Sequence, residues 1–147
     1  MIEMKIAGGE ALKEVFALRK EVFCDEQGYP EDLEFDQKDE NAVHLYMIIS
    51  GETVAAARIV TEGADSVIGR ICVKRDRRGE GLGRAMVLYA VDKCRKMGVS
   101  SISVMSEIDA VGFYEGLGFS KSGERYFDGY LDRQPMSFDM KHSFGCC

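Results

Sequence analysis

The stretch RDRRGEGLGRAM, residues 75–86, carries three glycines at alternate positions, 79, 81 and 83, with arginines on both sides. It follows the apolar run SVIGRICVK (66–74) and opens a segment in which apolar residues recur at helical spacing. The first N–H groups of a helix have no partner within the helix, and the helix dipole makes that end attractive to anions. Glycine lets the backbone approach a phosphate closely, because it has no Cβ. The stretch therefore predicts a phosphate-binding loop between a strand and a helix.

Two common phosphate-binding loops do not match this stretch. A P-loop needs Lys and then Ser or Thr after its last glycine, and no lysine directly follows any of the three glycines. The dinucleotide-binding pattern G-x-G-x-x-G fails because its third glycine would fall on Arg84 or on Met86. The pattern that remains is R-x-x-G-x-G, formed by residues 78–83.

The apolar periodicity on either side of the loop predicts a single domain, residues 1–147, of the α+β (mixed α/β) class. Short connections at 50–52 and 62–65 predict hairpins, so the centre of the sheet is expected to be an antiparallel meander. The helix after the glycine loop is expected to join two parallel strands. Strands are predicted at 2–7, 42–49, 53–61, 66–74, 99–106, 119–127 and 135–141, and helices at 10–24, 82–97 and 109–118.

Composition and charge restrict the class of protein. The net charge of −6 argues against a general nucleic-acid binder, and no apolar run is long enough to cross a membrane. Five cysteines without framework spacing favour free thiols in a reducing compartment, so we expect a cytoplasmic protein. Residues 25–40 hold eight acidic residues and one lysine, which suits either a solvated loop or a site for a cationic ligand.

The loop and a second motif together resemble the GNAT superfamily of acyl-CoA-dependent N-acetyltransferases. The segment AVGFYEGLGF (110–119) is similar to the family signature A-x-x-F-Y-x-x-x-G-F, and it follows the loop at the expected distance. The segment LRKEVFCDEQGYPEDLEFDQKDENAVHLY (18–46) further resembles the ElaA-like branch. The resemblance covers essentially the whole chain. It implies a largely antiparallel central sheet with a parallel splayed strand pair, flanked by helices.

The resemblance implies that acetyl-CoA is the co-substrate and that no metal is needed. The family pairs the pantetheine arm with the strand before the loop, and an amide near Val73 is the candidate oxyanion donor. Glu107 stands where the family commonly has Asn, which departs from the pattern at a pantetheine contact. The residues implied in coenzyme binding are Ile71, Cys72, Val73, Arg78, Gly79, Glu80, Gly81, Leu82, Gly83, Arg84, Glu107, Ala110, Phe113 and Tyr114.

Tyr114 occupies the position of the general acid in the family, while Phe113 is expected chiefly to pack. A phenol with a pKa of about 10 can protonate a leaving thiolate whose conjugate thiol has a pKa of about 8.5. Glu26, matching the ElaA-like E-Q, is the candidate for amine recognition or proton removal, with His44 and Arg70 as further substrate contacts. The alternatives are a solvent-facing Glu26 and a structural His44.

The chemistry expected is direct attack of a primary amine on acetyl-CoA in a ternary complex, without a cysteine nucleophile. The alternative is a non-catalytic acyl-CoA-binding regulatory or interaction module. The acceptor is expected to be a small-molecule or peptide amine, with no nucleic-acid or membrane partner, and a homodimer is compatible with the sequence. Arg19 falls within an apolar stripe and is expected to pair with an acid of residues 25–40, because a buried charge needs a partner. Cys146 and Cys147 are expected to be inert.

Overall fold

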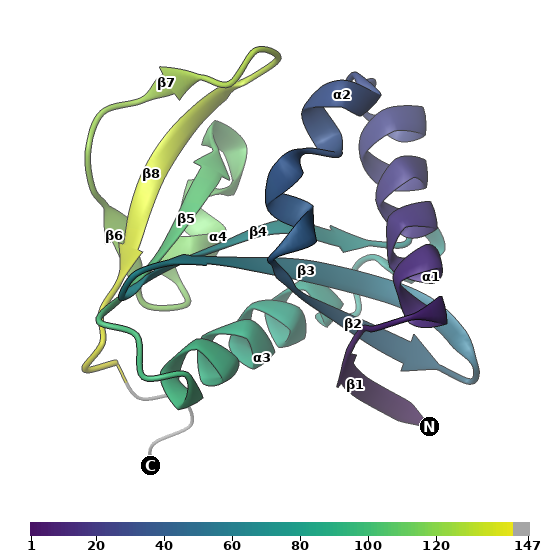
Figure 1. The fold of residues 1–147 in the computed structure, drawn as a ribbon. Coiled ribbons are helices and arrows are strands. Elements are labelled where there is room, and N and C mark those ends of the chain that lie inside the picture. The colour runs from purple at the N-terminus through teal and green to yellow at the C-terminus, as the bar shows by residue number, and fades with distance from the viewer. Residues whose placement is uncertain (143–147) are drawn as a thin grey trace.

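The computed structural model describes residues 1–142, so the Cys146–Cys147 pair lies outside the described residues. The chain forms one mixed sheet flanked by helices (Figure 1). The strands are β1 (Ile2–Ile6), β2 (Val43–Ile49), β3 (Glu52–Glu62), β4 (Asp65–Val73), β5 (Ser101–Glu107), β6 (Phe119–Lys121), β7 (Tyr126–Phe127) and β8 (Asp132–Phe138). The helices are α1 (Glu10–Arg19), α2 (Glu31–Glu34), α3 (Leu82–Lys96) and α4 (Val111–Glu115), with a π-helix η1 (Lys20–Glu26) and 3₁₀-helices η2 (Gln37–Glu40), η3 (Arg75–Arg77) and η4 (Ile108–Ala110).

The sheet has the order β1-β2-β3-β4-β5-β8-β6, with β7 also paired to β8. The pairs β2–β3 and β3–β4 are antiparallel and form the expected meander, and β1 is added antiparallel to β2. The pair β4–β5 is parallel and is joined through α3, while β5–β8 and β6–β8 are antiparallel. The mixed α/β class and the single parallel strand pair are therefore confirmed.

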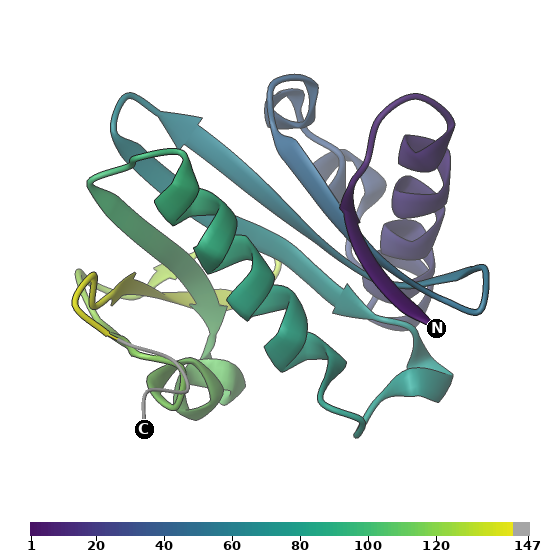
Figure 2. The ribbon, with the colours of Figure 1, turned by 90° about the horizontal axis from the view of Figure 1, so that it is seen from below.

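Two helices cover opposite faces of the meander (Figure 2). The apolar side of α3, including Met86, Val87 and Ala90, packs in the main core with Leu45 and Ile59 of the sheet. On the other face, α1 packs against β2, β3 and β4 in a smaller apolar group. Because these two helices hold β4 from both sides, the strand is fixed even where its pairing with β5 stops.

The pairing between β4 and β5 covers only the first part of the two strands. It runs from Asp65 opposite Ser101 to Ile68 opposite Val104, and no further. The pairing of β4 with β3 shifts register between Gly69 and Cys72, and Arg70, which lies between them, takes a positive φ of 51°. A bulge with a residue in this conformation bends a strand and increases its twist. The two strands diverge beyond this point, as the splayed pair of the resemblance implies.

The acidic segment 25–40 is not a simple solvated loop. It contains α2, which begins after Pro30, and η2, whose first turn is capped by the Asp36 carboxylate accepting from the Lys38 N–H. The expected partner of Arg19 lies here: its guanidinium donates to Glu34 Oε2 at 2.7 Å and to Asp39 Oδ1 at 2.8 Å. Arg19 is only 1% exposed, and this expectation is confirmed.

Three elements differ from the expectation. The segment 119–127 is two short strands, β6 and β7, because Gly123 has a φ of 67° and breaks the extended backbone. The last strand begins at Asp132 instead of Pro135, and the proline lies inside it, opposite Met105 of β5. The first helix continues as the π-helix η1 as far as Glu26.

We predict that Arg19→Met lowers the free energy of unfolding by about 3 kcal/mol, because it leaves the buried Glu34 carboxylate without its closest cation. Lys13→Met, which removes an exposed pair with Glu10, is the control and should change stability by less than about 0.5 kcal/mol. Urea unfolding of both variants measures this. Equal losses in the two variants would contradict the prediction.

Candidate active site

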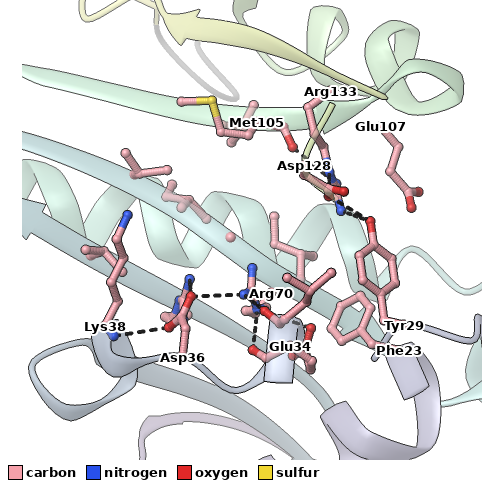
Figure 3. A pocket seen from close by; sticks show the side chains of 18 of the residues that line it. Phe23, Tyr29, Glu34, Asp36, Lys38, Arg70, Met105, Glu107, Asp128 and Arg133 are labelled. Carbon is pink, nitrogen blue, oxygen red and sulfur yellow. Dashed lines mark hydrogen bonds and ion pairs between the residues drawn. The ribbon is translucent and has the colours of Figure 1, made fainter. Parts of the chain in front are cut away.

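A cavity of about 840 Å³ occupies the region where β4 leaves β5 (Figure 3). Its walls come from both diverging strands, from the segment between η1 and η2, and from the β7–β8 hairpin. Ile71 of β4 and Glu107, Ala110 and Tyr114 from β5 to α4 all line it. With Arg70, which also lines it, the structure brings together five of the residues expected in the site, from two parts of the chain.

The glycine loop connects the end of β4 to α3. Gly79 and Gly81 have φ values of 83° and 80°, and Gly81 caps the helix in the left-handed conformation. A Cβ built at either position would meet nothing within 4 Å, so open space lies against this backbone. Gly83 lies in the first turn of α3, a helix of 15 residues. The N–H groups at the N-terminus of a helix have no partners within the helix, so they suit an anion. This geometry fits a bound pyrophosphate.

The other residues of the loop differ in accessibility. Glu80 and Arg84 are exposed, whereas Leu82 packs in the core, so only its backbone can serve a ligand. On β4, Cys72 is buried on the α1 side, and burial raises the pKa of its thiol to about 12. Its thiol is thus not a nucleophile at neutral pH, in line with the chemistry expected. Val73 is half-buried.

Arg78 and Glu26, expected in different parts of the site, bind each other. Nη1 and Nη2 of Arg78 donate to the two carboxylate oxygens of Glu26 at 2.8 and 2.9 Å. Nε of Arg78 also donates to the Val73 carbonyl at 3.0 Å. Glu26 does not line the main cavity. Since both of its oxygens are occupied at the glycine loop, its position favours a role in holding that loop instead of the expected role in handling the amine.

Tyr114 lies in α4 with its ring half-buried against Phe119, the ring centroids 5.6 Å apart. Burial is the main reason that the pKa of its hydroxyl is raised to about 12. Among the described residues, no hydrogen bond occupies this hydroxyl. Tyr114 is thus a protonated, available donor in the cavity wall, while Phe113 is 42% exposed and lies edge-on to it.

Comparison with known proteins agrees with this geometry. A family model for the GNAT acetyltransferase domain matches residues 7–140. A Bacillus subtilis protein with a provisional acetyltransferase name is 31% identical over 125 residues, which are 83% of this chain and 85% of that protein. The chain belongs to the GNAT acetyltransferase family.

Solved GNAT structures share the whole fold. The crystal structure of Escherichia coli ElaA is 26% identical and has a TM-score of 0.83, with 95% of this chain and 100% of that chain covered. The N-acetylglutamate synthase from Neisseria gonorrhoeae, solved with coenzyme A and N-acetyl-glutamate, is 17% identical with a TM-score of 0.74. That match covers 94% of this chain and 35% of the synthase.

In this GNAT protein, Arg70 lies in the cavity wall, but its guanidinium is already engaged. It donates to the carbonyls of Leu33 and Glu34, each at 3.0 Å, and to the Asp36 carboxylate at 3.2 Å. Arg58, also in the wall, donates to Asp36 at 2.7 Å. These contacts attach the α2 segment to β3 and β4, so Arg70 shapes the cavity.

His44 lies away from the cavity. It is 4% exposed, its Nε2 is 2.9 Å from the Asp39 carbonyl, and its ring packs edge-on to Phe16. Because the side chain is enclosed between α1 and η2, its position does not support the expected contact with substrate and fits the structural alternative instead.

Sequence reasoning missed a bridge across the cavity from the segment after η1 to the β7–β8 hairpin. The Tyr29 hydroxyl donates to Asp128 Oδ2 at 3.0 Å and accepts from Arg133, and Arg133 Nε donates to the same Asp128 oxygen at 2.8 Å. The Tyr130 hydroxyl donates to the Gln27 carbonyl at 2.7 Å. The partners lie about a hundred positions apart, and no local pattern in the sequence connects them.

We predict that this bridge is lost in acid. Burial raises the pKa of Asp128, but four hydrogen bonds to its carboxylate lower it more, so the pKa falls to about 2. The donors are the Leu131 N–H, Arg133, the Tyr130 N–H and the Tyr29 hydroxyl. A carboxyl with a lowered pKa stabilises the fold above its unfolded pKa of about 4, and this contribution disappears as the pH falls through the folded value.

Asp128→Asn should therefore lower the melting temperature at pH 7 and flatten its decline between pH about 4 and about 2. Asp132→Asn, an exposed acid on β8, is the control. Melting curves of the three proteins against pH provide the measurement. Parallel acid profiles of wild type and Asp128→Asn would refute this role of the bridge.

Proposed function

We propose that this GNAT protein is an N-acetyltransferase, which moves the acetyl group of acetyl-CoA to a primary amine by direct attack in a ternary complex. The observation that carries this proposal is the divergence of β4 from β5, which opens a cavity lined by Ile71 of β4 and Tyr114 of α4. The fold alone supports many chemistries. The available phenol in the cavity wall and the open anion-binding loop that follows β4 support this one.

The residues proposed to hold the coenzyme are those along β4 and the loop that follows it. Beyond Ile68, β4 has no pairing with β5, so the backbone of residues 71–73 has no strand partner on that side and would bind an extended pantetheine arm there, next to the Val73 carbonyl that accepts from Arg78 Nε. The N–H groups of residues 79–84 would bind the pyrophosphate, and Arg84 adds a positive charge there. Acetyl-CoA supplies an activated acyl thioester.

The protein's own contribution is to position the reactants and to move protons. Tyr114 donates its hydroxyl proton to the departing sulfur, which requires that the phenol stay protonated at neutral pH, as its raised pKa ensures. The cavity walls of β4, β5 and the Tyr29–Arg133 bridge enclose the acceptor, which favours a small amine or the tip of a longer side chain.

We predict that acetyl-CoA and free coenzyme A raise the melting temperature, and that ATP and NAD do not. A ligand at 100 times its Kd adds about 2.7 kcal/mol, or roughly 5–10 °C for a chain of this size. Arg84→Glu should reduce the shift by placing an anion beside the pyrophosphate, whereas Lys96→Glu, at the far end of α3, should keep it. The absence of any shift with either coenzyme at saturation would contradict the proposal. Binding of coenzyme without transfer to any amine would support a non-catalytic module.

We predict that Tyr114→Phe lowers kcat about 100-fold and leaves the affinity for acetyl-CoA unchanged, because only the proton donor is removed. Tyr89→Phe, on the partly buried face of α3, is the matched control and should retain full turnover. Steady-state kinetics with calorimetric titration of acetyl-CoA separates the two effects. An unchanged kcat in Tyr114→Phe would remove Tyr114 as the acid.

A further inference from the structure

The half-buried and buried carboxylates around the cavity differ in their partners. Glu34 lies against Arg19 and Arg70, and Asp36 lies against Arg58 and Arg70. Asp128 is held by Arg133 and by Tyr29. These three carboxylates are neutralised by the arginines and build the walls. None of them is free to receive a cationic ligand.

Glu107 is the exception among the carboxylates of the inner wall. It ends β5, lines the cavity and is half-buried. Among residues 1–142, its carboxylate has neither an ion pair nor a hydrogen bond with another side chain. Figure 3 shows the side chain projecting near Tyr29 and Arg133 without a marked interaction. The other unpaired acids that line the cavity, Asp32 and Glu62, are exposed at its rim.

Arg133 is the neighbouring cation, but its guanidinium forms no ion pair with Glu107, because its nitrogens donate to other groups. Nε of Arg133 donates to Asp128, Nη1 donates to the Met105 carbonyl at 3.3 Å, and Nη2 donates to the Tyr29 hydroxyl. Glu107 therefore presents an uncommitted carboxylate to the cavity, held in place by β5.

Glu107 also faces the same space as the proton donor. The 3₁₀-helix η4 joins the end of β5, where Glu107 lies, to α4, which carries Tyr114, and both residues line one cavity. The negative charge of Glu107 contributes to the raised pKa of the Tyr114 hydroxyl, although burial contributes more. A proton donor and an unpaired carboxylate thus line the same cavity, which opens where β4 and β5 diverge.

We propose that Glu107 binds the attacking amine of the acceptor and accepts its proton during the reaction, which makes Glu107 a catalytic residue. This role rests on the proposed function. As the nitrogen attacks, its lone pair forms the new C–N bond and the nitrogen becomes positively charged. A carboxylate beside it stabilises the charge that develops in the transition state. This role also gives a function to Glu107, which stands at the position where the resemblance leads us to expect asparagine.

The reaction balances in protons and electrons with the amine, the thioester, Glu107, Tyr114 and water. The C–N bond forms and the C–S bond breaks, with its electron pair leaving on sulfur. An N–H bond of the amine breaks and its proton moves to a Glu107 oxygen, while the Tyr114 O–H proton moves to sulfur. Water then carries one proton from Glu107 to the Tyr114 phenolate, and both residues return to their starting states.

The test compares Glu107→Gln, Glu107→Asp and Asp109→Asn with wild type, using butylamine, 1,4-diaminobutane and a lysine-containing tripeptide as acceptors. Glu107→Gln should lower kcat/KM for the accepted amine about 100-fold at pH 7, with a deficit that narrows as the pH rises and hydroxide replaces the carboxylate as the proton acceptor. Glu107→Asp should recover part of the rate. Asp109→Asn, an exposed acid two residues away that does not line the cavity, should behave as wild type.

The rise in melting temperature with acetyl-CoA distinguishes a failure of the Glu107 role from a failure of the proposed function. It should be the same in wild type and Glu107→Gln. Full activity of Glu107→Gln, a deficit independent of pH, or a loss of acetyl-CoA affinity that accounts for the lower rate would each overturn the role of Glu107 and leave the acetyltransferase standing. If wild type transfers acetyl to none of the amines, the proposed function itself fails, and the role of Glu107 fails with it.

Discussion

The site depends on one backbone event, the bulge between Gly69 and Cys72 of β4, which follows closely after Ile68, the last residue of β4 that pairs with β5. Arg70 is held at a φ of 51°, which is costly for a residue with a side chain and persists only where the surroundings enforce it. Its guanidinium provides the enforcement by donating to the carbonyls of Leu33 and Glu34 and to Asp36. The same contacts that fix the bulge therefore attach the acceptor-side wall to the sheet.

Three arginines beneath this wall explain why the acidic segment 25–40 can pack against the sheet. Arg19, Arg58 and Arg70 meet the acids of α2 and η2, and Arg19 also stacks near the rings of Phe16 and Phe35. Buried ion pairs of this kind add little net stability, but removing one partner is expensive. Their effect here is to fix the position of α2 relative to β4, and so the shape of the cavity.

The sequence alone predicted those features that are encoded locally. The glycine loop, the meander, the parallel pair and the buried partner of Arg19 follow from spacing and periodicity. The position of Tyr114 in the site followed from a motif. The positions of Glu26 and His44 could not be predicted, because their contacts with Arg78 and Asp39 form only when distant segments of the chain pack together. The bridge of Tyr29 with Asp128 and Arg133 is likewise a product of tertiary packing, and so is the free carboxylate of Glu107.

The most direct measurement is a crystal structure of the protein with coenzyme A bound. The account predicts the pyrophosphate on the N–H groups of residues 79–84, the pantetheine arm along β4 beyond Ile68, and the thiol sulfur within about 3.5 Å of the Tyr114 hydroxyl oxygen. Coenzyme bound elsewhere, or a sulfur far from Tyr114 with β4 and β5 closed upon each other, would contradict it.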